Sequence, residues 1–199
     1  NSDLGQLEKH LQNNDCIAIG EIGLDTYVAE IKQPEFYQKQ QQIFAEQLAL
    51  AKQYQKPVVL HVRKAHADVF KIIKQQKFSE GGIVHAFSGG VEEAKTYAKL
   101  GFKLGIGGSV TYPQAKRLHS VVNAMPIESL VIETDAPDMI PMPHRQENAK
   151  YTRNSPAYLP SVAHALAQAK QFSLEQLAQI LWKNSCQALH LTLKSSGFY

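Results

Sequence analysis

The sequence predicts an α/β protein with a parallel sheet, and three observations lead to this fold class. Five short, β-branched runs are apolar almost throughout, which is typical of strands covered on both faces. The segments between them have the apolar spacing of helices that lie on a core. The chain has 199 residues, 44% of them hydrophobic, which is enough for one sizeable core. We therefore expect a single domain, residues 1–199, built from repeated strand–helix units.

The expected elements alternate along the chain. A short helix over residues 3–11 precedes the first strand, and the strands cover residues 16–24, 57–62, 82–87, 102–107 and 130–134. Pro34 and Pro113 suit a first helical turn, where the N–H that proline lacks has no partner. Gly101 is expected to follow the end of a helix in the left-handed conformation. The longer helices are expected over residues 34–54, 66–74, 91–100, 113–125, 154–170 and 173–191.

The last two helices have side chains suited to their first turns. Asn154 is expected to cap the helix that runs to residue 170. Ser173 with Gln176 has the spacing of a capping box. Trp182, beside Leu181 in the last helix, is interpreted as a core residue.

Two parallel folds fit this alternation: a doubly wound open sheet and a (β/α)8 barrel. A full barrel needs eight strands and typically about 250 residues. This chain has five predicted strands in 199 residues. The pattern alone leaves both folds open.

Composition narrows the function classes. The formal net charge of +3 permits a polyanionic substrate without requiring one. Cys16 and Cys186 lie far apart and form no CxxC, so we expect no disulfide framework and a reduced, cytoplasmic setting. No apolar run reaches the roughly 18 residues of a membrane span, and no basic-then-apolar leader opens the sequence. We therefore expect no membrane partner.

Metal-competent side chains occur at the carboxyl ends of four predicted strands. Because these ends meet at one edge of a parallel sheet, we expect the side chains to converge there. Imidazoles and carboxylates at such an edge suit metal-assisted hydrolysis, and a carboxylate such as Glu21 can bridge two ions. No cysteine accompanies them, which argues against a structural zinc cage. The residues are Glu21 with Asp25, His61 with Arg63, His85, and Asp135.

Three features have more than one interpretation. Asp25 would either orient a ligand or contact substrate, or it would cap the turn after its strand. Arg63 would either hold a phosphate or pair with a carboxylate such as Asp25. The Ser88-Gly89-Gly90 segment would either cradle an anion or form an ordinary turn and helix N-cap.

At these residues the chain resembles the TatD family of metal-dependent deoxyribonucleases, and is most similar to its YjjV-like branch. Five motifs occur in the family's order and spacing, and the match extends over about residues 15–191. The segment NSPAYLP, residues 154–160, also matches. The motifs are GEIGLD (20–25), PVVLHVR (57–63), GIVHAFSGG (82–90), GIGGSVTYP (105–113) and ETDAPDM (133–139).

The resemblance implies a TIM barrel that cleaves phosphoester bonds, DNA being the family's substrate class, by attack of a metal-activated water. A complete site would use two divalent cations, with Mg²⁺, Mn²⁺ and Zn²⁺ not distinguished. Glu21 would bridge the two ions and have a catalytic role. His61 and His85 would complete one metal site. Asp135 would serve the other and orient the nucleophilic water. Beside these ligands, the residue types and positions of Arg63 and Asp25 make them the candidate substrate-binding residues.

The family's first strand ends in a His-x-His pair that completes the Asp135 site, and these 199 residues contain no such pair. We therefore expect an incomplete barrel of about five strand–helix units, lacking three strands and two metal ligands. Such a barrel would expose strand edges for self-association. Two alternatives stay open: a metal-dependent amide or ester hydrolase of the amidohydrolase type, and an inactive truncated barrel. Many amidohydrolases bridge their metals with a modified lysine, whereas Glu21 would take that place here.

Overall fold

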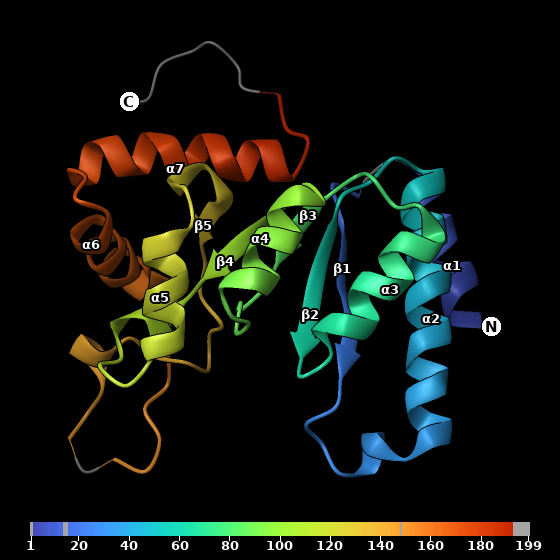
Figure 1. Cartoon of the computed structure of the whole chain (residues 1–199), viewed down its shortest axis with the longest axis horizontal. Helices are drawn as coiled ribbons and strands as arrows, with labels where there is room; N and C mark the ends of the chain where they lie inside the picture. The colour runs from blue at the N-terminus through green and yellow to red at the C-terminus, as the bar shows by residue number, and fades with distance from the viewer. Residues whose placement is uncertain (1, 14–15, 148, 193–199) are drawn as a thin grey trace.

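The computed structural model describes residues 2–13, 16–147 and 149–192. Its centre is a sheet of five parallel strands in the order β1-β2-β3-β4-β5 (Figure 1). This order follows the chain without reversal, so it excludes the doubly wound sheet, whose strand order reverses at a switch point. The strands are β1 (Ile19–Asp25), β2 (Val58–Arg63), β3 (Gly82–Val84), β4 (Phe102–Ile106) and β5 (Leu130–Ile132).

The sheet is an incomplete barrel, as expected from the sequence. Within the described residues, β1 and β5 each have one paired neighbour, and they do not pair with each other. The helices cover the sheet from outside, with α2 and α3 beside β1 and β2, and α5, α6 and α7 around β5 (Figure 1). They are α1 (Ser2–Gln12), α2 (Pro34–Gln53), α3 (His66–Gln76), α4 (Val91–Lys99), α5 (Lys116–Ala124), α6 (Leu159–Lys170) and α7 (Leu174–Ala188).

Single-turn 3-10 helices interrupt the loops. They are η1 (Glu30–Lys32), η2 (Gly108–Thr111), η3 (Ile127–Ser129), η4 (Met142–His144) and η5 (Pro156–Tyr158). Among the helices of the described residues, none is both long enough and apolar enough to cross a membrane.

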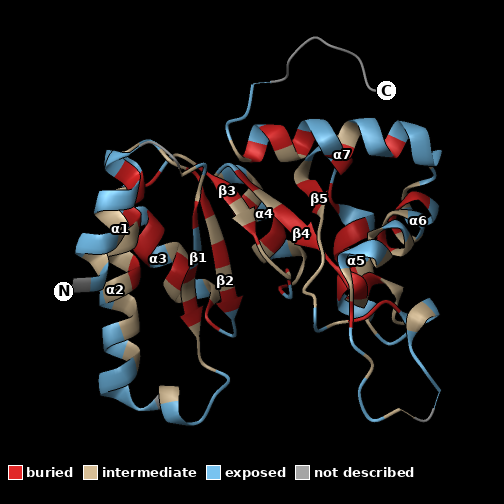
Figure 2. Cartoon of the chain, turned by 180° about the vertical axis from the view of Figure 1, so that it is seen from behind, coloured by how far each residue is buried: buried red, intermediate tan, exposed pale blue. Residues whose placement is uncertain are grey.

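The strand side chains alternate between a buried face and a more open one. On β2, Val58, Leu60 and Val62 are buried against the helices, whereas Val59 and His61 are only half-buried. Figure 2 shows the same division over the molecule, with buried residues concentrated on the strands and on the helix faces turned toward them. The open face of the sheet is therefore the inner face of the barrel.

The structure corrects three predictions about the helices and their residues. The helix expected from Pro113 begins at Lys116. Asn154 caps no helix: it is buried, and Ser155 caps the short η5 by accepting a hydrogen bond from Ala157 N–H at 3.3 Å. Trp182 is 53% exposed rather than in the core. The capping box of Ser173 and Gln176 is confirmed, and Gly101 has a φ of 86°.

Candidate metal centre

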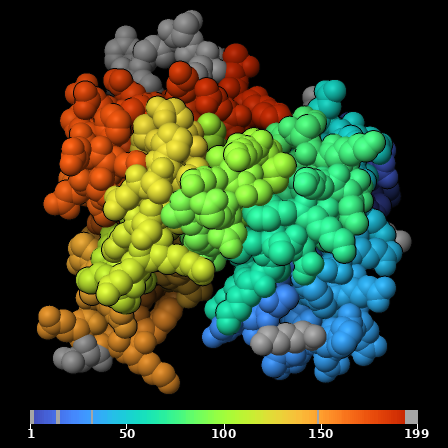
Figure 3. All heavy atoms as spheres, in the orientation of Figure 1, coloured from blue at the N-terminus to red at the C-terminus, as the bar shows by residue number. Residues whose placement is uncertain are grey.

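The candidate site lies on the inner face of the sheet, at the carboxyl ends of the strands. On β1, Ile22 and Leu24 are buried toward the helices, so Glu21 and Asp25 lie on the other face. His61 occupies the corresponding face of β2. Strands β3 and β5 end earlier than the sequence predicted, at Val84 and Ile132, so His85 and Asp135 lie just past them. In Figure 3 the surface is notched at its lower edge, where these strands end.

The Glu21 carboxylate lies between the two imidazoles. Its Oε2 is 3.6 Å from Nδ1 of His61, and its Oε1 is 3.6 Å from Nε2 of His85. Nε2 of His85 is also 3.3 Å from Oδ1 of Asp135. The structure therefore brings together the four residues that the sequence suggested as ligands.

Asp25 contacts the far side of the His61 ring. Its Oδ2 lies 3.0 Å from Nε2 of His61, and its Oδ1 accepts a hydrogen bond from Tyr27 N–H at 2.6 Å. Because an ionised carboxylate only accepts, this contact assigns the proton to Nε2 and leaves Nδ1 facing Glu21. Partial burial raises the pKa of Asp25, but these hydrogen bonds and the positive charge of Arg63 outweigh burial and lower it.

Gln40, from α2, holds the backbone of Asp25 in place. Its side-chain oxygen accepts from Asp25 N–H at 3.0 Å, and its side-chain nitrogen donates to the Asp25 carbonyl at 3.2 Å. The amide thus satisfies both backbone groups that the end of this edge strand presents. Sequence reasoning missed Gln40, because nothing in the sequence distinguishes it from its neighbouring glutamines.

Glu133 contacts the far side of the His85 ring. Its Oε2 lies 3.0 Å from Nδ1 of His85, and its Oε1 accepts a hydrogen bond from Ala86 N–H. The hydrogen bond between His85 and Glu133 is the main reason why the pKa of His85 rises to about 9; burial opposes the rise, and the charges of nearby carboxylates add to it. Gly105 on β4 makes room, because a Cβ there would lie 2.3 Å from Glu133 Oε2. Glu133 was missed as a site residue, although it stands two positions before Asp135, on the same side of an extended chain.

The donor set suits a divalent ion. Each histidine has one ring nitrogen held by a carboxylate and the other turned toward Glu21, which is the usual arrangement around metal-binding imidazoles. Here the side chains contact one another directly. Consequently, within the described part of the chain, no three His, Cys, Asp or Glu residues are spaced to enclose a single ion. Ion binding would require these side chains to separate.

Arg63 forms no ion pair with Asp25. Among the described residues no carboxylate lies within 4.0 Å of its guanidinium. The group stacks instead on the ring of Tyr27, with Cζ 3.5 Å from the ring centroid. The Ser88-Gly89-Gly90 segment forms a turn and an N-cap, since Gly90 N–H donates to the carboxylate of Glu93 at 2.9 Å. That hydrogen bond favours the interpretation without a bound anion.

The loop after Asp135 is tied down by Asn154. This side chain is 4% exposed and donates to the carbonyl of Asp138 at 2.7 Å, while its backbone N–H donates to the carbonyl of Pro137 at 2.7 Å. A cavity of about 440 Å³ lies between this loop and the segment around Asn154, and it is lined by Ala136, Pro137, Arg153, Asn154, Ser155 and Pro156. Arg153 therefore brings a positive charge to the segment that follows Asp135.

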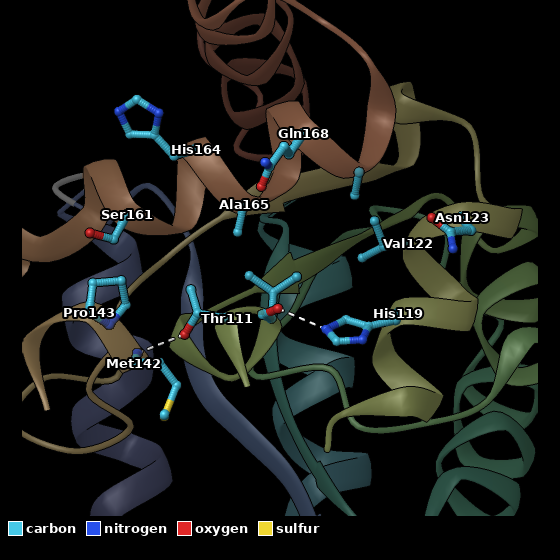
Figure 4. Close-up of a pocket in the computed structure, with 12 residues that line it drawn as sticks. Thr111, His119, Val122, Asn123, Met142, Pro143, Ser161, His164, Ala165 and Gln168 are labelled. Carbon is cyan, nitrogen blue, oxygen red and sulfur yellow. Dashed lines mark hydrogen bonds between the residues drawn. The ribbon is translucent and has the colours of Figure 1, made fainter. Parts of the chain in front are cut away.

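A larger cavity, of about 800 Å³, lies away from this cluster, between α5 and α6 (Figure 4). His119 points into it and donates to the carbonyl of Val110 at 2.8 Å, whereas His164 points away. Its lining contains no carboxylate and none of the six residues suggested by the sequence. Carboxylates are among the ligands that divalent ions prefer, so the cluster around Glu21, and not this cavity, is the candidate metal centre.

Comparisons with known proteins find relatives that are described as metal-dependent hydrolases. A relative from Haemophilus influenzae, described as an uncharacterized metal-dependent hydrolase, is 36% identical over 94% of this chain and 70% of its own. The uncharacterized metal-dependent hydrolase YjjV of Escherichia coli is 36% identical over 92% of this chain and 68% of its own. The crystal structure of E. coli YjjV, a TatD homologue, matches with a TM-score of 0.84 at 33% identity, covering 95% of this chain and 70% of that one.

The fold and these relatives together define a metal-dependent hydrolase built on a (β/α)8-barrel framework. The family model described as TatD related DNase matches residues 1–190. The chain therefore belongs to the TatD family.

Proposed function

We propose that the site hydrolyses phosphodiester bonds with divalent cations, and that DNA is its substrate class. The position of Glu21 carries this proposal, because one carboxylate faces two imidazoles through its two oxygens. Glu21, His61 and His85 would hold one ion. Asp135 would serve a second ion and orient the attacking water. When bound, the ions would activate that water and neutralise charge on the phosphoryl oxygens.

Two further observations support a phosphoester rather than an amide. Arg63 presents a guanidinium without a carboxylate partner among the described residues, two positions from His61 on the same strand face. A planar guanidinium suits bidentate binding of phosphate. The cluster also contains no lysine that could be modified to bridge two metals, as in many amidohydrolases. The description of the family as DNases points to the same substrate class.

The test is a substrate screen with added Mg²⁺ or Mn²⁺. The panel is bis(p-nitrophenyl) phosphate, single-stranded DNA, a p-nitroanilide and a p-nitrophenyl ester. We expect metal-dependent cleavage of the two phosphodiesters, reduced at least about 100-fold by Glu21→Gln, which removes a charged metal ligand. Glu128→Gln is the control, because Glu128 is exposed and precedes the amino end of β5. Cleavage of the amide or the carboxylic ester alone would overturn the proposal.

A further inference from the structure

The ring of Tyr27 lies beside the candidate metal centre with two cations around it. Tyr27 follows the end of β1 by two residues and is 51% exposed. The guanidinium of Arg63 stacks on the ring at 3.5 Å, and the ammonium of Lys64 lies 5.0 Å from the ring centroid. An aromatic face attracts cations, so the ring holds the two positive charges at one place.

The backbone fixes this arrangement. Thr26 N–H donates to the carbonyl of Arg63 at 3.1 Å, and the Thr26 hydroxyl donates to the carbonyl of Lys64 at 3.0 Å. Consecutive side chains of a strand point to opposite faces, which would separate Arg63 from Lys64. Lys64 instead has a φ of 56°, and this left-handed turn ends the alternation. A non-glycine residue adopts that conformation at a cost of about 1 kcal/mol, and here the turn brings both cations to one ring.

Both cations remain available to an anion. Within the described residues, no carboxylate lies within 4.0 Å of the Arg63 guanidinium or the Lys64 ammonium. Stacking occupies only the face of the guanidinium, whereas its N–H donors lie in its plane and stay free for a phosphate. Arg63 and Lys64 are both exposed.

The stack adjoins the candidate site without being part of it. Arg63 is paired in register with Asp25, whose carboxylate contacts His61. Two strand positions, about 7 Å along the chain, separate Arg63 from His61 on the same face of β2. An anion held by the stack would therefore be a neighbour of the group bound at the metal centre rather than that group itself.

We infer that Tyr27, Arg63 and Lys64 form a subsite for a phosphate that flanks the scissile one, so that the site favours oligonucleotide chains over single phosphoesters. This inference rests on the proposed phosphodiesterase function. Tyr27 is a positioning residue, since it places the two cations and leaves the contact with phosphate to them.

The test measures binding and cleavage separately. Binding of fluorescein-labelled decathymidylate to the metal-free 199-residue chain is followed by anisotropy in EDTA over a range of salt concentrations. Lys64→Gln should reduce the slope of log affinity against log salt by about 0.7, the value for one phosphate contact on a single strand. Tyr27→Leu should weaken binding about 3-fold, since an exposed cation–π pair is lost, and Tyr27→Phe should restore it. Lys99→Gln is the matched control, because Lys99 is exposed at the far end of α4, near the amino ends of the strands.

Cleavage assays locate the effect on one phosphate. Tyr27→Leu and Lys64→Gln should raise KM for single-stranded DNA while leaving kcat, and the cleavage of bis(p-nitrophenyl) phosphate, unchanged. Equal losses on both substrates, or a Lys64→Gln salt slope like that of Lys99→Gln, would overturn the subsite. Absence of all phosphodiester cleavage would refute the proposed function instead, and decathymidylate binding would still decide the subsite.

Discussion

His61 and His85 are held from opposite sides of their rings. Asp25 contacts Nε2 of His61, whereas Glu133 contacts Nδ1 of His85, so different nitrogens of the two rings face Glu21. When the rings are neutral, as metal ligands must be, the two outer carboxylates would set which nitrogen of each ring carries the proton. Residues that touch no ion would then decide the geometry of the metal ligands.

Replacing Glu133 tests this arrangement. Glu133→Gln should weaken divalent-metal binding about 10- to 100-fold, because the carboxylate that orients His85 and increases its basicity is lost. Isothermal titration calorimetry with Mn²⁺ measures the affinity, and Glu128→Gln is the matched control. Equal affinity in wild type and Glu133→Gln would show that Glu133 only fills space beside Gly105.

The raised pKa of His85 predicts a pH-dependent stability of the metal-free protein. Its folded pKa, about 9, lies above the ordinary histidine value of 6.5, so the folded chain binds this proton more tightly than the unfolded chain. The stabilisation is complete below about pH 6.5 and is lost as pH rises through about 9, and it amounts to about 3 kcal/mol at most. Urea unfolding in EDTA of wild type and His85→Gln should give free energies that differ more at about pH 6 than at about pH 10. A pH-independent difference would contradict the prediction.

At the scale of the elements, the sequence predicted the strands and the metal-competent side chains at their carboxyl ends, because the periodicity of apolar residues places each strand and its end. The α/β class, the parallel direction of the strands and the convergence of Glu21, His61, His85 and Asp135 could be predicted this way, whereas the choice of a barrel over a doubly wound sheet rested on the family resemblance. The role of Asn154 could not be predicted, because asparagine suits both a helix N-cap and a buried position that hydrogen-bonds to another loop. The contact partner of Arg63 could not be predicted either, because the turn at Lys64 decides whether the guanidinium meets Asp25 or Tyr27.

The contact between α2 and the end of β1 gives a prediction at this scale. Gln40→Ala removes the two hydrogen bonds to Asp25 and leaves its backbone groups without that partner, so the free energy of unfolding should fall by about 1–2 kcal/mol. Gln38→Ala is the control, because Gln38 lies on the same helix and is exposed. Urea denaturation in EDTA measures both variants, and an equal effect of the two would refute the role assigned to Gln40.

At the scale of the whole molecule, the open sheet leaves two strands with one partner each among the described residues. Unpaired edges favour pairing with another strand, so we expect the 199-residue chain to self-associate. On the β1 edge, Gln40 satisfies the backbone hydrogen-bonding groups of the last residue, Asp25, alone. Sedimentation velocity at several concentrations should show the average mass rising with concentration, and a constant monomer mass would contradict this expectation.

The two proposed metal sites should differ in the 199-residue chain. In the proposed arrangement, Glu21, His61 and His85 would give one ion three protein ligands, whereas the Asp135 site would lack the His-x-His pair that the resemblance to the family implies. Titration with Mn²⁺ should therefore give one tight site per chain, lost in His61→Asn and retained in Asp135→Asn. Extending the chain at its amino end with the family's first three strands should add a second tight site and raise the turnover of single-stranded DNA well above that of the 199-residue chain, because a second ion would add to the stabilisation of the attacking and leaving oxygens. A version of that extension with both added histidines replaced by alanine separates metal binding from closure of the barrel. Equal turnover by the 199-residue chain and the extended chain would show that the histidine pair is dispensable.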